Sequence, residues 1–366
     1  MNTKQLSSII TFGVIALIAI TVFILRKTDY SYLTNECDKI ASDIIREHEV
    51  NTETPLRTTH KSVSGLRKKA QSIEKEFLLP QRQSLPEIKK SFISSTAFKP
   101  VRLGKIQKKQ TKKEHLLILD FFYKGLKLYR LILRQKIVLA DIALVIDDWG
   151  YSNKVLRKSL SLGIPLTYAV LPCLPYSTRI AQIASDSGHE VILHLPLEPH
   201  NAQKHPLEKN TIFTSMSKEK IESIIKDAMA SVPNLKGINN HMGSKATESE
   251  YVLNILFDQI KKNSLYFLDS CTSNKTLVTQ AALQKGISFI RRDVFIDNVS
   301  SKDYIKGQLL IAKNIAAEKG KVIAIGHAKD LTLDTLQEII PELEREGFRF
   351  VLLSALLNDI KPPAAE

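Results

Sequence analysis

Five apolar runs of this sequence end in side chains that can bind a metal or transfer a proton. The side chains are Asp147 and Asp148 after "ALVI", His194 after "EVIL", Asn239, Asn240 and His241 after "KGI", Asp269 after "YFL", and His327 after "VIAIG". A single Asp at such a place is often only a helix cap. Five together predict one site, because parallel strands of a barrel open their carboxyl ends on the same face.

These residue types favour metal-assisted hydrolysis. A carboxylate and two neutral imidazoles form a three-ligand catalytic zinc site with a fourth position left for water. Such a metal lowers the pKa of its water and polarises a carbonyl group. One carboxylate then remains as a base and a further His as an acid. No Gly-rich phosphate loop follows any of these strands, and no G-x-S-x-G motif is present. We interpret the set as a site that hydrolyses an amide or an ester.

The adjacent pair Asp147 and Asp148 predicts a division of roles. If the strand keeps its alternation, the two side chains point in different directions, so one can hold a metal while the other meets its water. Two neighbouring charges also raise the cost of ionising both groups, and a bound cation would relieve that cost.

Short apolar runs recur from residue 141 and predict the elements that position these residues. The runs are 142–146, 166–171, 190–195, 236–240, 265–269, 287–290, 321–326 and 348–353. Helical patterns separate most of them, which is typical of a parallel sheet covered on both faces. We therefore expect an α/β fold, a distorted (β/α) barrel of seven or eight units over residues 140–360.

The N-terminal part differs in charge. Residues 1–140 hold 26 Lys and Arg against 12 Asp and Glu, whereas residues 141–366 hold 26 of each, so the net charge of +14 lies in the first part. We interpret residues 29–139 as a basic, Lys-rich stalk that contains a small α+β module. Such a segment could attract an anionic glycan or lipid. No nucleic-acid motif is visible, so we expect no nucleic-acid partner.

Within this stalk the patterns predict a helix over 31–50, a linker over 51–65, a second helix over 66–78 and a loosely structured stretch over 81–113. Two β-prone runs around "YKG" predict a hairpin over 115–135. The three cysteines, Cys37, Cys173 and Cys271, form neither a disulfide framework nor a metal motif. One pair of them could form a disulfide bond in an oxidising compartment.

Residues Ile9–Leu25 form a 17-residue stretch without a charge, followed by Arg26 and Lys27. This length is at the short end for a spanning helix, and no signal-peptide cleavage site follows it. We expect residues 1–28 to be an uncleaved, single-pass anchor in the inner membrane of a bacterium, with the barrel on the periplasmic or extracytoplasmic side. The flanking charges alone leave the orientation open.

Six motifs together resemble the divergent polysaccharide deacetylases, a branch of the NodB-type, carbohydrate esterase family four superfamily. They are "ALVIDDWGYS", "PLTYAVLP", "GHEVILHLPLEP", "INNHMGSKAT", "FLDSCTS" and "AIGHAKDLTLDTLQEIIPELEREGFRFV", over about residues 140–360. The resemblance implies a distorted (β/α) barrel, a divalent metal that is usually zinc, and hydrolysis of N-acetyl groups on an amino-sugar polymer.

The resemblance also implies roles for six residues. Asp147 resembles the catalytic base, and His327 resembles the acid that protonates the leaving amine. Asp148, His194 and His241 resemble the metal ligands, while Asp269 resembles a strand-end carboxylate that orients His327 or a ligand. Typical members carry both histidines on one H-x-x-x-H segment, whereas position 198 here is Glu. We interpret His189, His200 and His205 as surface residues.

Two alternatives stand beside a membrane-anchored deacetylase of an envelope carbohydrate polymer. The first is a non-catalytic barrel that binds a glycan or a protein and retains a structural metal. The second is a hydrolase of another bond, such as a peptidoglycan amide. The presence of Asp147, Asp148 and His327 favours an enzyme, because a decayed site is expected to lose one of them.

Overall fold

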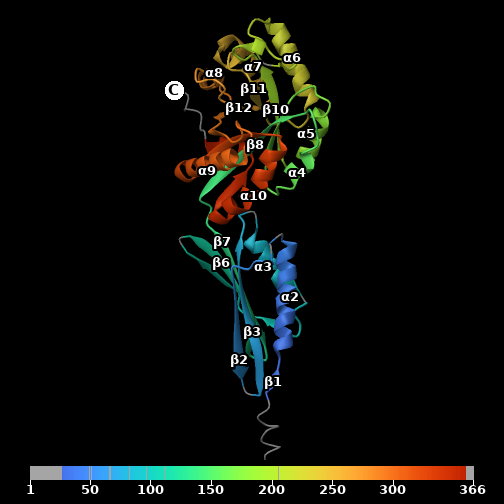
Figure 1. Ribbon diagram of the computed structural model, residues 1–366, viewed down its shortest axis with the longest axis vertical. Coiled ribbons are helices and arrows are strands. Elements are labelled where there is room, and N and C mark those ends of the chain that lie inside the picture. The colour runs from blue at the N-terminus through green and yellow to red at the C-terminus, as the bar shows by residue number, and fades with distance from the viewer. Residues whose placement is uncertain are drawn as a thin grey trace, which may run out of the picture. The chain divides into compact units, whose positions relative to one another are not determined.

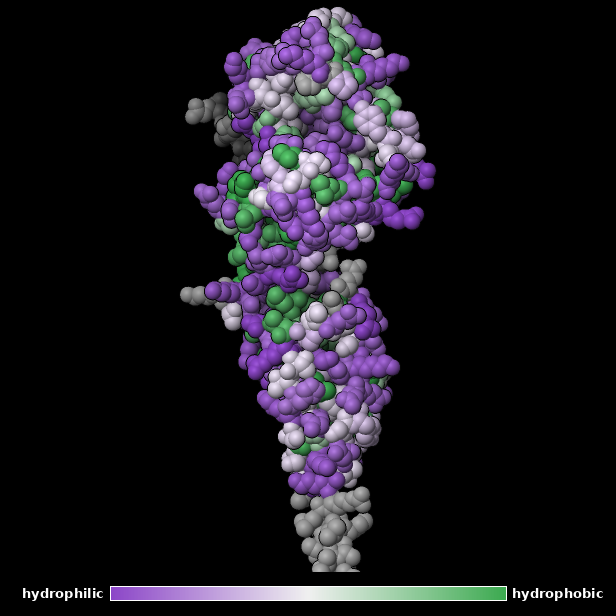
Figure 2. Space-filling model, in the orientation of Figure 1, coloured by the Kyte–Doolittle hydropathy of each residue, from purple (hydrophilic) through white to green (hydrophobic). Residues whose placement is uncertain are grey.

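The computed structural model describes residues 27–359, apart from residues 49, 51, 66, 82, 96, 112 and 205. The chain divides into two compact units between Ile137 and Val138 (Figure 1). Hydrophilic residues cover most of the visible face of each unit (Figure 2). The interpretation of residues 29–139 as a stalk stays a prediction.

The predicted location in the inner membrane is contradicted. Among the described residues, no helix combines the length and the apolar character that crossing a bilayer requires. The stretch that carried the prediction, Ile9–Leu25, lies outside those residues. The single-pass location is therefore withdrawn.

The first unit is a mixed sheet with helices on one face. Its elements are β1 (Thr28–Asp29), α2 (Ser31–Glu47), β2 (Arg57–Gly65), β3 (Lys68–Leu79), α3 (Leu85–Ser94), β4 (Arg102–Leu103), β5 (Gln107–Gln110), β6 (Glu114–Tyr123) and β7 (Leu126–Lys136). The strand order is β1-β3-β7-β6-β4, with β2 beside β3 and β5 beside β6. Helix α2 buries Leu33, Cys37, Ala41 and Ile44, one face at helical spacing, against β3 and β7.

The helix predicted over 31–50 and the hairpin predicted over 115–135 are confirmed. The helix predicted over 66–78 is wrong, because this segment is strand β3. β3 pairs with β2 on one side and with β7 on the other, and this pairing outweighs the helical spacing of its apolar residues. Part of the predicted linker is β2, and the stretch predicted as loose contains α3, β4 and β5.

The second unit is a curled sheet in which every strand pairing is parallel. Its strands are β8 (Ala140–Trp149), β9 (Thr167–Val170), β10 (Glu190–Leu197), β11 (Gly237–Met242), β12 (Tyr266–Asp269), β13 (Phe289–Arg291), β14 (Val294–Phe295), β15 (Lys321–His327) and β16 (Phe348–Val351). The order is β13-β12-β11-β10-β9-β8-β15-β14, and β16 pairs with the start of β8. The predicted α/β fold with a parallel sheet is confirmed.

One short segment links the two edges of this sheet. β13 pairs with β12, and β14 pairs with β15, although only residues 292 and 293 separate β13 from β14. The backbone N–H of Arg292 donates to Asp269, and that of Asp293 donates to Ile323. The sheet thus curls through one chain segment that changes partner midway, rather than closing by a ladder between its edge strands.

Helices cover the outside of the sheet (Figure 1). They are α4 (Leu156–Leu160), α5 (Ser177–Asp186), α6 (Lys218–Ser231), α7 (Glu250–Lys262), α8 (Val278–Lys285), α9 (Lys302–Lys319) and α10 (Asp330–Glu346), with the 3-10 turns η1 (Ala202–Lys204), η2 (Ala246–Glu248) and η3 (Leu353–Asp359). Alternate strand residues face inward and form a second apolar cluster, which includes Val145, Ile192, Leu268 and Ile325. Leu353 of η3 belongs to this inner cluster.

Candidate metal centre

The site forms where the inward-facing rows of the sheet become polar. Two residues after inner-cluster Val145, Ile192 and Ile325 come the polar residues Asp147, His194 and His327. Because strand side chains alternate with a period of two, these residues continue the same inward rows toward the carboxyl end of the sheet. The chain thus builds its site as the last layer of the sheet's interior.

Asp148, His194 and His241 converge on one point. Asp148 Oδ1 lies 3.3 Å from His194 Nε2 and 3.2 Å from His241 Nδ1. The two ring nitrogens lie 3.0 Å apart. Three potential ligand atoms, contributed by β8, β10 and β11, therefore form a nearly equilateral triangle.

This triangle fits a divalent metal. Tetrahedral zinc with ligands at about 2.0–2.1 Å requires ligand atoms roughly 3.4 Å apart, close to the sides of the triangle. Asp148 Oδ1 is also buried without a hydrogen-bond partner. A buried carboxylate oxygen without a hydrogen bond is costly, and a cation would compensate it. The donor set of one carboxylate and two imidazoles is that of a catalytic zinc site with an open position.

The backbone at Asp148 places both carboxylates on the same side. Asp148 has φ +63°, in the left-handed region, and the pairing of β8 with β9 shifts register between Ile146 and Trp149. The irregularity breaks the alternation that the sequence predicts for the pair. Asp147 Oδ2 lies 3.6 Å from His194 Nε2, so both carboxylates approach the same imidazole. The expected divergence of the two side chains is therefore wrong.

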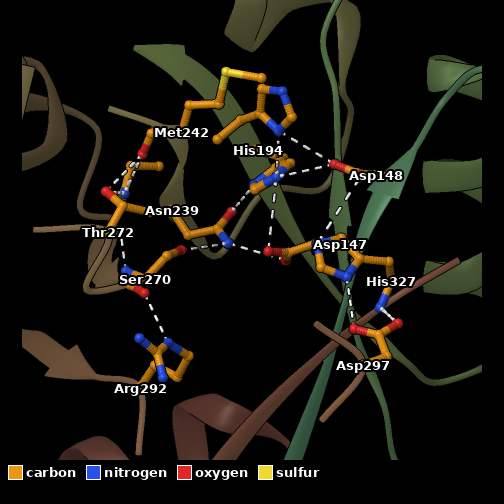
Figure 3. Close-up of polar contacts among 12 residues, drawn as sticks. Asp147, Asp148, His194, Asn239, Met242, Ser270, Thr272, Arg292, Asp297 and His327 are labelled. Atoms are coloured by element: carbon orange, nitrogen blue, oxygen red, sulfur yellow. Dashed lines mark hydrogen bonds and ion pairs between the residues drawn. The ribbon is translucent and has the colours of Figure 1, made fainter. Parts of the chain in front are cut away.

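Asn239 connects the carboxylate of Asp147 to the imidazole of His194 (Figure 3). Its Oδ1 lies 2.8 Å from His194 Nδ1, and its Nδ2 donates to Asp147 Oδ1 at 3.0 Å and to Ser270 Oγ at 3.3 Å. Because the amide oxygen can only accept, His194 in its neutral form carries its proton on Nδ1. This tautomer leaves the Nε2 lone pair free for a metal.

The environments of the two aspartates move their pKa values apart. Burial is the main influence on Asp147 and raises its pKa, and the charge of Asp148 adds to this effect. Burial also opposes ionisation of Asp148, but the adjacent imidazoles of His194 and His241 outweigh it and hold its pKa well below the usual range. Burial lowers the pKa of His194, but the two carboxylates outweigh it and raise that pKa to about 9.

His327 is held by Asp297, a residue that the sequence did not predict for the site. Asp297 Oδ1 lies 2.7 Å from His327 Nδ1, and its Oδ2 accepts from the His327 backbone N–H at 2.9 Å and from Thr332 Oγ1 at 2.6 Å. A Cβ on Gly326 would lie 2.9 Å from Ile296, so a glycine here lets the segment with Asp297 approach β15. His327 Nε2 lies 4.0 Å from Asp148 Oδ2 and so faces the triangle.

Asp297 also raises the pKa of His327. Burial lowers the pKa of His327, but hydrogen bonding to Asp297 and its charge outweigh this effect, and the pKa is raised. The pKa of Asp297 is lowered by His327 and Thr332 in spite of burial. The pair therefore favours a protonated imidazole that faces the triangle.

Asp269, a further candidate from the sequence, lies apart from this cluster. It is fully buried and accepts from the Cys271 backbone N–H at 2.8 Å and from Thr276 Oγ1 at 3.2 Å. Because Leu268 faces inward, alternation turns Asp269 outward and Ser270 inward. Asp297, rather than Asp269, contacts His327.

Glu198 replaces the second histidine of the H-x-x-x-H pattern and has a different role. It accepts from Lys245 Nζ at 2.7 Å and from the Thr214 backbone N–H and hydroxyl, each at 2.7 Å. The neighbouring strand supplies His241 instead, whose Cα pairs with that of Pro196.

Two further histidines that the sequence analysis considers, His189 and His200, lie outside the triangle. His200 is exposed and contacts Glu248. His189 is half-buried, accepts from the Leu166 backbone N–H and packs beside Tyr168, so its surface interpretation is wrong. His205 lies outside the described residues.

The curled parallel sheet and its Asp–His–His cluster define an α/β protein with a potential metal site at the carboxyl ends of its strands. A family model described as "Divergent polysaccharide deacetylase" matches residues 144–357. The chain belongs to this family, which confirms the resemblance of its motifs.

Two relatives and one solved structure are similar to this chain. "Uncharacterized protein YibQ" of Escherichia coli K12 is 38% identical over 229 residues, 63% of this chain and 71% of that protein. An uncharacterized protein of Haemophilus influenzae is 30% identical over 198 residues, 54% of this chain and 70% of that protein. The crystal structure of ATU2773 from Agrobacterium tumefaciens C58 covers 59% of this chain and 89% of its own, with a TM-score of 0.57 and 24% identity, and shares the fold.

Proposed function

We propose that residues 140–360 form a zinc-dependent hydrolase that removes N-acetyl groups from a carbohydrate polymer. The observation that carries the proposal is the triangle of Asp148, His194 and His241, with 3.0–3.3 Å between its ligand atoms. Membership of the deacetylase family supports the choice of bond, an acetamide on a sugar.

Asp148, His194 and His241 would hold the metal. When bound, a divalent metal supplies Lewis acidity toward a carbonyl oxygen and makes a bound water more acidic. Asn239 fixes the His194 ring and its tautomer, so Nε2 points at the triangle without rearrangement.

Asp147 is placed to act as the general base. Its carboxylate borders the triangle, and its Oδ1 is fixed by Asn239. Because burial raises its pKa toward neutrality, the carboxylate is a stronger base than an exposed aspartate. We assign it the removal of a proton from the attacking water.

His327 is placed to act as the general acid. Asp297 orients its Nδ1, so that Nε2 faces the triangle from the β15 side. Because the pKa of His327 is raised, its imidazole stays protonated to a higher pH than an ordinary histidine. We assign it the donation of a proton to the departing amine, which would otherwise leave as a poor anion.

Acetate release from N-acetylated glycans by the zinc-loaded protein tests the proposal. Asp147→Asn should lower kcat by about 10²- to 10⁴-fold, the usual contribution of a general base. Zinc content should stay unchanged, since Asp148, His194 and His241 remain.

Asp141→Asn is the matched control, because Asp141 lies at the other end of β8 and pairs with Arg349 on the surface. It should leave acetate release unchanged. Stoichiometric zinc without acetate release from any glycan would contradict deacetylation and favour either a barrel that only binds its ligand or a hydrolase of another bond.

A further inference from the structure

A cavity of about 460 Å³ lies in the first unit, between the start of helix α3 and strands β5, β6 and β7. Leu85 and Pro86 of α3 and Leu117 of β6 provide an apolar part of its wall, and β5 contributes Lys108 and Gln110. The volume falls in the range of ~300–1,000 Å³ that is usual for ligand sites. The cavity therefore joins an apolar surface to β5, a strand at the edge of its sheet.

Strand β5 has a free edge. It pairs with β6 on one side, and no other strand of the described residues pairs with it. The backbone N–H of Thr111 donates to the Glu114 carbonyl, and this bond fixes the alternation of the ladder. By this alternation the backbone of Lys109 bonds to β6, whereas the N–H and C=O groups of Lys108 and Gln110 point away from it. The edge thus offers the backbone donors and acceptors of two residues beside the cavity.

The surface around β5 is strongly basic. Residues 88–113 hold nine Lys and Arg and no Asp or Glu. Those of the nine that the structure describes form no ion pair, whereas Arg130 and Arg134 of the same sheet are paired with carboxylates. Because its positive charge is not compensated within the unit, this stretch attracts an acidic partner by long-range electrostatics.

The same lysines disfavour a second copy of this chain as the occupant of the edge. Lysine on an edge strand prevents pairing with another basic edge, since like charges would then face each other. Such protection does not require a cavity with an apolar wall next to the edge. A free edge with an adjacent pocket is the arrangement used for strand addition, in which backbone hydrogen bonds give affinity and pockets for alternate side chains give specificity.

We infer that β5 binds an extended, acidic segment of a partner protein as an added strand. Lys108 and Gln110 pair with Leu117 and His115 and share their face of the sheet, so alternate side chains of the added strand lie on the face of the cavity. Apolar side chains of the segment enter the cavity, and its acidic side chains lie among the lysines. The inference is independent of the proposed function, since neither zinc nor a glycan takes part.

Titration calorimetry of the full chain with a nine-residue peptide of alternating Glu and Val tests this inference. In an extended strand the peptide presents one acidic and one apolar row. It should bind with 1:1 stoichiometry, and added salt should weaken the binding. The same peptide with N-methyl groups on its central amides keeps the charge but loses the backbone donors. It should bind about 10-fold more weakly or worse, the cost of two backbone hydrogen bonds.

Gln110→Pro tests the edge from the side of the protein. It removes one outward N–H without changing the charge, and proline is tolerated where the N–H of an edge strand faces solvent. Binding of the Glu-Val peptide should weaken by about 3- to 10-fold. Gln110→Ala is the matched control, because it shortens the same side chain but keeps the N–H, and it should bind like the wild type.

Charge reversal tests the basic surface. Lys109→Glu should weaken binding, whereas Lys61→Glu should not, because Lys61 lies on β2, an edge strand beside β3 that does not line the cavity. Urea unfolding of each variant establishes whether the fold is retained. If Gln110→Pro fails to fold, the N-methylated peptide and the wild type still decide the role of the backbone.

Three outcomes would overturn the inference. Equal binding of the N-methylated peptide, or of a galacturonate hexamer, would indicate a surface for anionic polymers in general. Absence of binding by the wild type would indicate an edge that its lysines only protect. Dimerisation of the wild type in light scattering, lost in Gln110→Pro, would show that a second copy occupies the edge.

Discussion

Two groups of charged residues in this protein are built in opposite ways. The first unit carries a charged face, the side of its sheet opposite α2, formed by Glu74, Glu76, Glu114, Asp120, Arg130 and Arg134. Arg130 bonds to both oxygens of Asp120 at 2.6 and 2.7 Å, and Arg134 joins Glu76 and Glu114. Each carboxylate on this face therefore has a guanidinium partner.

The triangle lacks such compensation. The carboxylate of Asp148 meets two imidazoles there, a second carboxylate, that of Asp147, borders them, and Asp148 Oδ1 is buried without a hydrogen bond. Opposite charges in direct contact stabilise a fold, whereas incompletely compensated charges that converge on a point are maintained for a ligand. A cluster of charged residues thus does not by itself indicate a site. Carboxylates that lack full compensation by opposite charges and hydrogen bonds do indicate one.

The largest effect is expected from Asp148→Ala. It removes one of three metal ligands, so the loss of zinc affinity should exceed the ~10- to 100-fold that loss of an outer partner costs. Zinc should raise the unfolding temperature of the wild type, because it binds the folded state, and should leave that of the variant unchanged. Equal zinc content in both proteins, measured by atomic absorption, would show that the triangle is not the metal site.

Asp297→Asn should have the next largest effect. The variant keeps an acceptor for His327 but removes the charge that raises its pKa. The loss of kcat should be smaller than the ~10² to 10⁴ expected when a general acid is removed. Because activity is lost as pH rises through the pKa of the acid, the alkaline limb of the pH–rate profile should move to lower pH. An unmoved limb would argue that His327 is not the acid.

Zinc affinity should also depend on pH. The metal-free site holds a proton on His194, whose pKa is about 9, and zinc must displace it. Affinity should therefore fall as pH is lowered below 9, by about tenfold per pH unit for one displaced proton. Chelator competition between pH 6 and 8 measures the slope, and a flat dependence would place the zinc away from His194.

Arg130→Met should have the smallest effect on chemistry. It leaves the buried Asp120 without its guanidinium, which should cost the first unit about 1–3 kcal/mol of unfolding free energy. Urea unfolding measures that cost, while zinc content and acetate release should not change. A parallel fall in acetate release would show that the charged face contributes to the site and that the comparison fails.

The sequence predicted most of the second unit because its strands are unbroken apolar runs. It could not predict β14, which has only two residues, and so it missed Asp297 two residues later. Asp269 was included because it ends a strand, although the period of two already turns it away from the row that contains Leu268. Strand ends locate a site, and alternation decides which of their residues belong to it.

Two local features depend on contacts distant in sequence and were beyond a reading of patterns. The left-handed backbone at Asp148 accompanies the shift in register between β8 and β9. The residue types at these positions do not predict either feature. The segment 66–78 has apolar residues at helical spacing but becomes a strand, because β2 and β7 both pair with it.

The pairing of β8 has a consequence for the order in which the protein is made. β8 is the first strand of its unit to be synthesised, yet it pairs with β15 and β16, the last two. Asp147 and Asp148 can therefore meet His327 only after the unit has been synthesised as far as β15. A truncated product that stops before residue 321 would lack both the late histidine and the strand that flanks β8. The unit can acquire its complete set of reactive groups only once its synthesis is almost finished.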